Sequence, residues 1–266
     1  MKKTMIISLI GSFSTLLANA ELSEFKEKSA TPHRLFVDPN ILWSHGKGIG
    51  EEGSLLYRIK INNVFYGLRA GYEYVQQNSV YAGVDGLYSF GKSQIDLSRS
   101  TEIDLGFFGS SPHYPAKLTF SGKNNHFANG EGRIGYAFQT LDYLTLTPFV
   151  GIGGYSIKNN AMFSISQNWV YAAGGLRTSF AINSTFELGI NAKAMRTGYV
   201  KTQLKRWDFY SFHPANFWGY EIDVPFTYHL GTENNWTAQI EPYFLKLDVK
   251  SNTNIYGGKI LLTYCF

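Results

Sequence analysis

The stretch Tyr256–Phe266, YGGKILLTYCF, decides the fold of this chain. Counted back from the last residue, one set of alternate positions is aromatic or aliphatic apart from a single glycine: Phe266, Tyr264, Leu262, Ile260, Gly258 and Tyr256. The other set consists of Cys265, Thr263, Leu261, Lys259 and Gly257. Successive side chains of a β-strand point to opposite faces. The alternation therefore predicts a strand with one face against an apolar medium.

The first twenty residues have the three parts of a secretory signal peptide. Lys2 and Lys3 precede the mostly apolar stretch from Met5 to Leu17, and Ala18-Asn19-Ala20 has the small-x-small spacing of a cleavage site. We therefore predict that residues 1–20 are removed and that the mature chain begins at Glu21.

The bulk composition of the mature chain excludes few functions. Without Lys2 and Lys3, 22 Lys and Arg face 20 Asp and Glu, so the net charge falls from +4 to about +2. A nearly neutral chain gives no reason to expect a nucleic-acid partner. The one cysteine, Cys265, has no second cysteine with which to form an internal disulfide, and we interpret it as a small filler residue.

Alternating patterns between turn residues predict about twelve strands. They are 33–43, 54–62, 64–76, 79–90, 95–108, 127–139, 143–155, 169–181, 185–196, 216–229, 236–249 and 255–266. Two are weak: 54–62 is brief, and 95–108 would direct Arg99 to the apolar side. If either fails, the number is ten.

The connections alternate between short and long, with exceptions. Short turns are predicted at Asn62-Asn63, Gly91 to Gln94, Thr140 to Asp142, Asn183-Ser184 and Gly231 to Asn235. Long segments are predicted at 44–53, 109–126, 156–168 and 197–215. Two connections on the long side, Gln77-Asn78 and Ser251 to Asn254, are short.

The terminal phenylalanine that closes an alternating strand resembles the C-terminal signature of bacterial outer-membrane β-barrels. In that class the last strand is recognised during insertion into the membrane. The resemblance therefore implies that the barrel assembly machinery is a partner and that Tyr264 and Phe266 form the assembly signal. Arg69-Ala70-Gly71-Tyr72 and Thr147-Pro148-Phe149-Val150-Gly151 are similar to stretches of small OmpA-type barrels. The resemblance implies an all-β fold: residues 33–266 form a single transmembrane antiparallel β-barrel in the outer membrane of a Gram-negative-type bacterium. Residues 21–32 would be a periplasmic N-terminal segment.

Aromatic residues on the outward face should form two girdles at the membrane interfaces. The strand assignment places Tyr66, Phe90, Trp236 and Tyr264 among those at the periplasmic ends. It places Trp43, Tyr72, Tyr74 and Trp218 among those at the outer ends.

The inward face collects charges of both signs, so we expect them to pair across neighbouring strands. The predicted lumen-lining residues are Arg69, Glu73, Asp85, Glu102, Asp104, Arg133, Arg177, Glu187, Lys193, Glu221, Asp223 and Glu241. A lumen lined by one sign would select for the opposite ion. This one predicts weak selectivity at most.

Evidence for enzyme chemistry is slight. Some outer-membrane barrels are phospholipases or lipid A deacylases with a His-x-Ser pair, and the nearest arrangement here is the reversed Ser211-Phe212-His213. Ser211 and His213 would share a face of an extended segment, but no third group that orients the base can be named. The six histidines have no metal-ligand spacing, so no metal and no cofactor are expected.

The segment 197–215 combines basic and aromatic residues. Lys201, Lys205, Arg206 and Trp207 lie within it, and Asp208 is its only acid. Phosphate pairs well with Lys and Arg, so lipopolysaccharide is the first candidate ligand. The alternative is a solvated loop packed over the barrel mouth.

These patterns predict a non-enzymatic surface protein. It would be a structural barrel or a narrow, weakly selective pore, in contact with outer-membrane lipid, whose loops bind envelope or host components. An outer-membrane lipid hydrolase is the alternative, and a soluble exported β-sandwich is the third.

Overall fold

The structure, a computed structural model, describes residues 32–52, 55–99, 117–160, 165–204, 209–213, 217–230, 236–247 and 253–266. The predicted signal peptide lies outside these residues, as does the segment 21–32 apart from Pro32, so both assignments stay predictions. No helix among the described residues is long and apolar enough to cross a membrane.

The described chain is built from β-strands. They are β1 (His33–Glu52), β2 (Leu55–Val75), β3 (Ser79–Arg99), β4 (Lys117–Leu141), β5 (Leu144–Asn159), β6 (Ile165–Ala181), β7 (Phe186–Leu204), β8 (Phe209–His213), β9 (Trp218–Asp223), β10 (Phe226–Leu230), β11 (Trp236–Leu247) and β12 (Thr253–Cys265).

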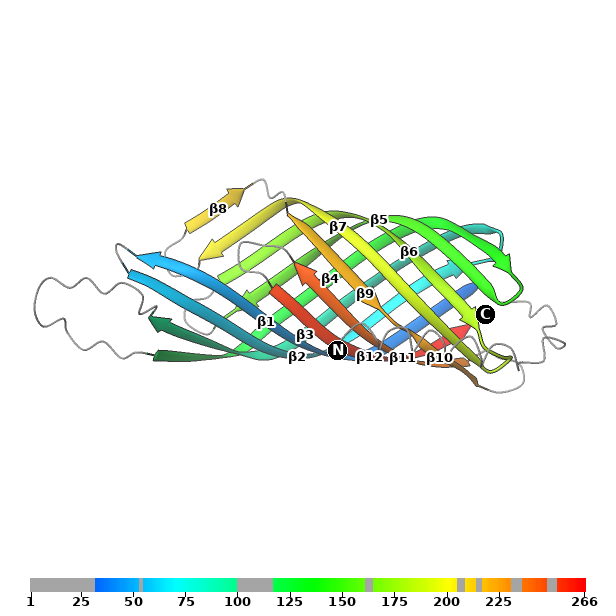
Figure 1. Cartoon of the computed structure of the whole chain (residues 1–266), viewed down its shortest axis with the longest axis horizontal. Coiled ribbons are helices and arrows are strands. Elements are labelled where there is room, and N and C mark those ends of the chain that lie inside the picture. Colours follow the sequence, from blue (N-terminus) through cyan, green and yellow to red (C-terminus); the bar gives the residue numbers. More distant parts are fainter. Residues whose placement is uncertain are drawn as a thin grey trace, which may run out of the picture.

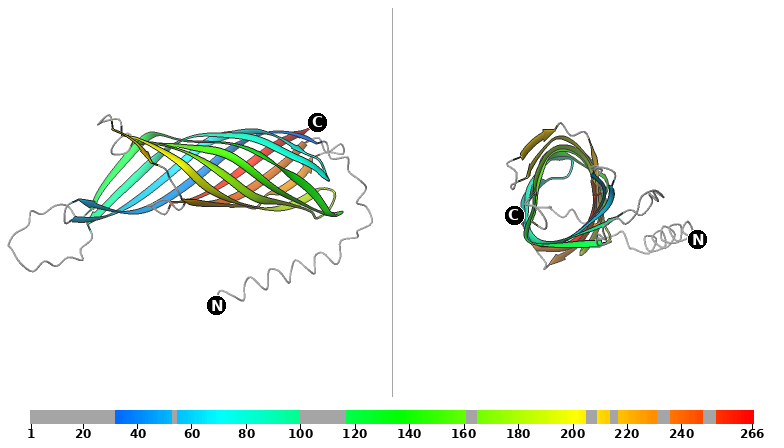
Figure 2. Two further views of the ribbon diagram at one scale, coloured as in Figure 1. Left: turned by 90° about the horizontal axis from the view of Figure 1, so that it is seen from above. Right: turned by 90° about the vertical axis from the view of Figure 1, so that its left-hand side faces the viewer.

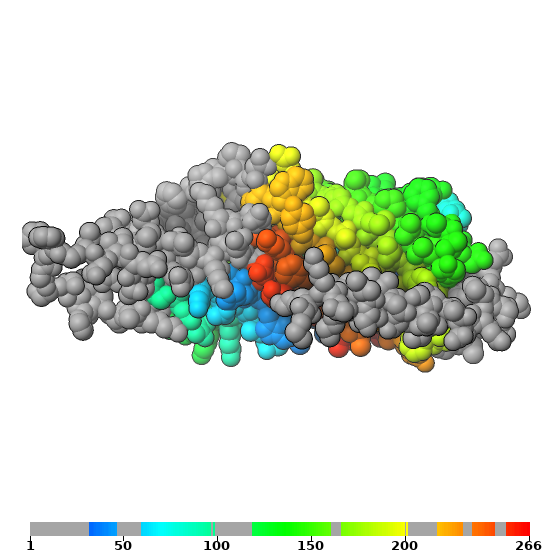
Figure 3. All heavy atoms as spheres, viewed as in Figure 1, coloured from blue at the N-terminus to red at the C-terminus, as the bar shows by residue number. Residues whose placement is uncertain are grey.

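Antiparallel pairing runs from β1 to β7 in chain order, then through β9 and β10 to β11 and β12, and finally closes the ring. β12 pairs with β1 over the register Arg34↔Cys265 to Gly46↔Thr253. In Figure 3 the red atoms of β12 lie directly against the blue atoms of β1. The elongated barrel is seen from the side in Figure 1, and the view along its axis in Figure 2 shows a closed ring. Because the ring is closed, no strand edge exposes unpaired backbone N–H and C=O groups to lipid. This is the condition that a membrane-spanning sheet must meet.

The ring contains ten strand positions in the described residues. β9 and β10 together fill one of them, because both pair with β7 on one side and β11 on the other. Pro225 separates them, yet Gly189 N donates to Pro225 O at 2.8 Å and Val224 N donates to Pro242 O at 3.1 Å, so the hydrogen bonding continues past the break. β8 pairs with the far end of β7 and stands outside the ring.

The predicted count of twelve strands is therefore wrong, and the ten-strand alternative is confirmed. The predicted turns at Asn62-Asn63 and Gly91 to Gln94 lie inside β2 and β3. Asn63 continues the register between Ser44 and Ser93, and its side-chain amide donates to Ser44 Oγ at 2.6 Å. The second predicted turn is a β-bulge, where the register between β3 and β4 shifts between Gly91 and Ser93.

One predicted turn lies at the other end of the barrel from the one predicted. The turn at Gln77-Asn78, predicted on the outer side, joins β2 to β3 at the end of the barrel where both ends of the ring lie, Pro32 and Phe266. We call this the turn end, because the connections 76–78, 142–143, 182–185 and 231–235 there are short. We call the opposite end the loop end. Asn78 adopts a φ of 52°, a left-handed conformation that asparagine tolerates in tight turns.

The strands are longer than a membrane requires, so the predicted long loops are largely strand. β4 has 25 residues, whereas about 9–11 tilted residues cross a bilayer. Most of 44–53, 156–168 and 197–204, and the second half of 109–126, belong to strands. The barrel is consequently elongated along its axis (Figure 1).

The two faces of β12 differ as the terminal alternation predicts. Phe266, Ile260 and Tyr256 are more than half exposed or close to it, whereas Cys265, Thr263 and Leu261 are buried inside the barrel. The outward surface is apolar over its middle, with Val37, Leu68, Val84, Val150 and Ile240 exposed. A surface of this kind belongs against lipid rather than water.

Both aromatic girdles are present, but some aromatic residues belong to the girdle at the opposite end of the barrel from the one predicted. Tyr72 and Tyr74 lie at the turn end, where Tyr72 is opposite Leu35 and Tyr74 is opposite His33. Tyr66 and Phe90 lie next to each other in the girdle nearer the loop end. The predicted turn inside β2 caused the exchange, because it reversed the assigned direction of the chain.

Candidate functional site in the barrel interior

Charged side chains inside the barrel form a connected set of ion pairs, which we call the lumen network. Glu73 on β2 accepts hydrogen bonds from Arg177 on β6 at 2.5 Å, from Arg133 on β4 at 3.4 Å and from the Tyr81 hydroxyl at 3.2 Å. Arg133 also pairs with Asp85 on β3. These contacts join four strands near the turn-end half of the lumen.

The network continues around the barrel from Asp85. Arg69 Nε donates to Asp85 at 3.0 Å, and its Nη1 lies 4.0 Å from Glu241. Glu241 on β11 pairs with Lys259 on β12. The network thus crosses the junction between the last strands and the first strands of the ring.

A second branch leaves the network through Glu131. This residue on β4 lies 3.7 Å from Arg133 Nε and 2.7 Å from Lys193 Nζ, and it accepts a 2.6 Å hydrogen bond from the Tyr171 hydroxyl. Lys193 on β7 pairs in turn with Glu221 on β9 at 2.9 Å. The ion pairs between Arg or Lys and Asp or Glu therefore link five cations with five anions: Arg69, Arg133, Arg177, Lys193, Lys259, Glu73, Asp85, Glu131, Glu221 and Glu241.

The balance of the network has a structural consequence. Each charge faces an opposite charge across the lumen or across a strand pair, and these side chains are at most about a quarter exposed. Breaking a buried pair by removing one partner is costly because the remaining charge is left desolvated. The network can therefore hold eight strand positions of the ring in one register.

Three further acids face the interior. Glu187 lies 3.6 Å from His229 near the turn end, and Asp223 accepts a 2.5 Å hydrogen bond from the Asn191 amide. Asp38 is fully buried, and neither of its carboxylate oxygens has a hydrogen-bond partner. The backbone register places Asp38 directly opposite Arg69.

A cavity of about 680 Å³ occupies the turn-end half of the barrel. It reaches the turn residues Gln77, Asp142 and Asn183 at one end and the apolar side chains of Phe127, Tyr155 and Leu245 at the other. Members of the lumen network line its walls. The cavity is thus a vestibule that ends at a layer of apolar side chains.

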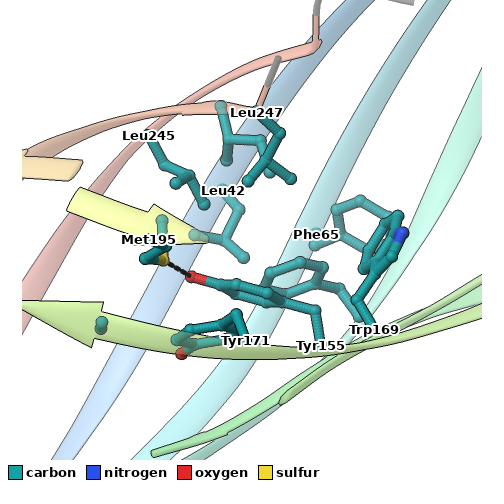
Figure 4. Packing of buried hydrophobic residues seen from close by; sticks show 11 residues of the cluster. Leu42, Phe65, Tyr155, Trp169, Tyr171, Met195, Leu245 and Leu247 are labelled. Atoms are coloured by element: carbon teal, nitrogen blue, oxygen red, sulfur yellow. Dashed lines mark hydrogen bonds between the residues drawn. The ribbon is translucent and has the colours of Figure 1, made fainter. Parts of the chain in front are cut away.

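That layer is a cluster of large buried side chains, which we call the apolar plug. Its members are Leu42, Phe65, Phe127, Tyr155, Trp169, Tyr171, Ala173, Met195, Leu245, Leu247 and Ile255, with Leu87, Ile157, Phe217 and Tyr243 packed against them. In Figure 4, Tyr155 and Trp169 project from β5 and β6 toward Leu42, Leu245 and Leu247, and Phe65 lies beside Leu42 on the neighbouring strand. The space between Tyr155, Trp169, Met195 and Leu247 is a crevice without room for a water molecule.

Nine of the ten strand positions of the ring supply side chains to the plug or against it, and the tenth lies against it at a glycine. β1 to β7 supply Leu42, Phe65, Leu87, Phe127, Tyr155, Trp169 and Met195, and β11 and β12 supply Leu245 and Ile255. β9 contributes Gly219, where an added Cβ would lie 3.0 Å from Met195 Cε and 3.1 Å from Leu247 Cδ2. The rings of Tyr155 and Tyr171 stack with centroids 5.0 Å apart, and the Tyr155 hydroxyl donates to Met195 Sδ at 3.6 Å. The plug therefore gathers side chains from around the ring at one level of the barrel.

The structure brings together ten of the twelve residues predicted to line the lumen. Arg69, Glu73, Asp85, Arg133, Arg177, Glu187, Lys193, Glu221, Asp223 and Glu241 all line the cavity. Glu102 and Asp104 lie outside the described residues.

The other predicted sites fall on several parts of the chain. Lys201 lies on β7, so it is part of a strand and not of a loop, whereas Lys205, Arg206 and Trp207 lie outside the described residues. Ser211 and His213 lie on β8, opposite Thr202 and Val200, and their side chains are outside what the structure describes. Tyr264 and Phe266 lie side by side on the outward face at the turn end, with ring centroids 6.0 Å apart.

Sequence reasoning missed Glu131 and the plug. Glu131 is two residues from Arg133 in a strand, so the same alternation that placed Arg133 inside would have placed Glu131 there. The plug gave no comparable signal, because its members are single inward residues on separate strands and only the register brings them to one level.

Among the described residues, no group of three or more His, Cys, Asp and Glu side chains is arranged to hold a metal ion. Cys265 is buried on the inward face of β12, which suits a small packing residue.

Comparison with known structures identifies the fold. The crystal structure of the outer membrane protease OmpT from Escherichia coli matches with a TM-score of 0.58 and 12% identity, over 91% of this chain and 100% of that one. The fold is that of a bacterial outer-membrane β-barrel. The translocator domain of the autotransporter NalP from Neisseria meningitidis also matches, over 100% of both chains, with a TM-score of 0.46 and 12% identity. No protein-family model and no curated protein sequence matches the chain.

Proposed function

We propose that this protein is a closed structural barrel of the outer membrane, which carries an extended rim of strands and loops at the cell surface and conducts no solute through its lumen. The apolar plug is the observation that carries the proposal. An ion or sugar crossing the plug would lose its hydration without gaining polar partners, and burying a polar group without such partners is costly. Hydrophobic constrictions also close pores by excluding water.

The lumen network supports the same function. A wide diffusion pore needs an open lumen, whereas here Arg177 on β6 and Lys193 on β7 reach across the interior to acids on the distant strands β2 and β4. The side chains that would line a pore instead form ion pairs that join different strands of the barrel wall. This makes the narrow, weakly selective pore the weaker of the two roles that the sequence predicts.

The rim beyond the membrane band supports a role at the surface. β3 and β4 run on toward the connection 100–116, and β7 pairs with β8 beyond the ring. Strands in this position present their connections at a fixed distance from the lipid. We infer that envelope or host components bind on this rim, and that the barrel assembly machinery inserts the barrel through its last strand.

A liposome-swelling assay tests the proposal. Purified protein that shows the heat-dependent gel shift of a folded barrel is placed in liposomes, which are then diluted into an iso-osmotic solution of arabinose. We expect swelling no faster than in protein-free liposomes. A rate that rises with the amount of protein and falls with the size of the sugar would show an open lumen and refute the proposal.

The lipid-hydrolase alternative rests on Ser211 and His213 alone. Because the side chains of both residues lie outside what the structure describes, this alternative stays a prediction. Phospholipid and lipid A turnover by the purified barrel, compared with a Ser211→Ala variant, tests it directly.

A further inference from the structure

The mouth of the vestibule is lined by uncharged polar side chains. We call six of them the collar: Thr145, Thr147, Ser179, Thr237, Gln239 and Thr263, all of which line the cavity. Gln239 lies two residues nearer the turn end than the network member Glu241 on β11. Thr263 lies four residues nearer that end than Lys259 on β12. A ligand that enters from the turn end therefore meets the collar before it reaches the lumen network.

The collar surrounds the mouth of the vestibule. Thr145 and Thr147 are on β5, and Thr263 is on β12. In the ring of ten positions, β12 is five positions from β5, which is as far apart as two strands can be. Thr237 lies directly opposite Thr263 in the register of β11 and β12. Threonine hydroxyls therefore border the cavity on opposite walls.

Three collar threonines are buried in the wall, yet their hydroxyls have no partner in the described part of the chain. Thr147, Thr237 and Thr263 are at most 7% exposed. Among the described residues, no side-chain hydrogen bond involves any of the three. A buried polar group without a hydrogen bond is costly. These hydroxyls therefore bond to whatever occupies the cavity.

The collar also holds one amide in a fixed orientation. Thr227 Oγ1 donates to Gln239 Oε1 at 3.2 Å, and Gln239 Nε2 donates to Glu241 Oε2 at 2.8 Å. Both groups of the amide keep capacity for a further bond, because its oxygen accepts two hydrogen bonds and its nitrogen donates two. Gln239 therefore offers a positioned donor and a positioned acceptor beside the threonine hydroxyls.

The charges near the mouth give no preference for an ion of one sign. Arg34, Asp142, Glu187 and His229 line this end of the cavity, and Glu187 lies 3.6 Å from His229. Deeper in, the lumen network pairs its five cations with five anions. A charged ligand would have to disrupt such pairs, and breaking a buried pair is costly. An uncharged ligand rich in hydroxyl groups does not meet this cost.

We propose that the collar binds an uncharged sugar of one or two rings, which enters from the turn end and rests on the lumen network. Sugar hydroxyls both donate and accept, as the collar hydroxyls do, so the two can replace the water that solvates each of them. The cavity volume of about 680 Å³ is within the range of small-molecule sites. Because the vestibule ends at the apolar plug, it is a binding site and not a pathway. In the proposed orientation of the barrel the sugar comes from the periplasm, and this source, unlike the site, rests on the proposed function.

Saturation-transfer NMR on the purified barrel tests the proposal. The detergent is lauryldimethylamine oxide, which has no sugar headgroup, and the probes are maltose and N,N′-diacetylchitobiose. We expect magnetisation to pass from the barrel to at least one of these sugars. The variant T237V/T263V removes two hydroxyls and keeps nearly the same shape, so it should fold. It should bind that sugar about tenfold more weakly, because two hydrogen bonds are lost.

T197V is the matched control. Thr197 is also a buried threonine, 5% exposed, but it follows Met195 on β7 and lies on the loop-end side of the plug. A sugar in the vestibule does not contact it, so T197V should bind as the parent does. The gel shift on boiling shows that each variant is folded.

Cys265 gives a second measurement in the parent chain itself. It is the only cysteine of the chain, it lines the cavity, and it is two residues from Thr263. We expect iodoacetamide to modify Cys265 several-fold more slowly when the neutral sugar saturates the site, and we expect this protection to be lost in T237V/T263V. Glucose 6-phosphate, a charged sugar, should give no protection.

Three results would overturn the proposal. The first is no saturation transfer to either neutral sugar, which would mean that the collar hydroxyls bind water only. The second is equal affinity of folded T237V/T263V and T197V for the sugar. The third is a Cys265 whose rate of modification does not change with the neutral sugar, or changes equally with glucose 6-phosphate. All three measurements use solubilised protein, so they do not depend on whether the lumen conducts, which liposome swelling tests separately.

Discussion

Toward the turn end, the barrel interior is held by charged side chains that leave a cavity between them, whereas nearer the loop end apolar side chains fill the same cross-section. Both levels are built from inward residues of the same strands: β6 supplies Arg177 to the network and Trp169 to the plug. A charged side chain needs a partner at a set distance, so the network connects specific strands. An apolar side chain needs only contact, so the plug fills space and excludes water.

The difference in chemistry predicts different responses to substitution. In the network, the loss of one carboxylate leaves cations unpaired in a buried place. In the plug, the loss of one side chain leaves a hole. The following variants separate these two responses.

Glu73→Gln should give the largest loss of stability. It removes the negative charge that Arg177 and Arg133 share while keeping the volume of the side chain. We expect the free energy of unfolding to fall by about 3–5 kcal/mol, as when one partner of a buried pair is removed. Urea unfolding in lipid vesicles, followed by the gel shift, measures the loss. Asp142→Asn, in an exposed turn, is the control, and an equal midpoint for the two variants would contradict a stabilising network.

Leu42→Ala should give a somewhat smaller loss. Leu42 is fully buried in the plug, so its truncation leaves a cavity and should cost about 2–4 kcal/mol. Leu68→Ala is the matched control, because Leu68 is 61% exposed on the lipid-facing side and its truncation creates no internal cavity. The same unfolding assay decides between them. Similar losses of unfolding free energy for both variants would mean that the burial of Leu42 in the plug does not stabilise the barrel more than an exposed leucine does.

Tyr155→Phe should have the smallest effect. It removes only the hydrogen bond from the hydroxyl to Met195 Sδ and keeps the ring that stacks on Tyr171. Weak hydrogen bonds of this kind contribute at most about 1 kcal/mol. We expect nearly parental unfolding and liposomes that still do not swell. Swelling in this variant would show that the hydroxyl, and not the packing, closes the lumen.

The fold could be predicted because its signals are local. The alternation that ends at Phe266 needs one strand only, and the same reasoning placed Arg69, Glu73 and Asp85 inside the barrel. The strand count failed at Asn62-Asn63 and Gly91 to Gln94. Residues of these types favour turns, but here the neighbouring strands continue the ladder on both sides, and only the tertiary pairing shows it.

The contents of the lumen could be predicted only in part for a related reason. A charged residue among apolar neighbours is visible in sequence, so most of the network was found. Tyr155, Trp169 and Met195 look like ordinary strand residues, and their meeting at one level depends on the stagger between strands that are far apart in the chain.

Planar-bilayer recording tests the closed lumen most directly, on the parent barrel and on a Tyr155→Ala/Trp169→Ala variant that opens the plug. We predict no conductance steps from the folded parent. The variant should show small steps with weak ion selectivity, because the lumen network balances five cations against five anions. Stable steps of the same size from the parent and the variant would contradict the account, because they would mean that the apolar plug does not close the barrel.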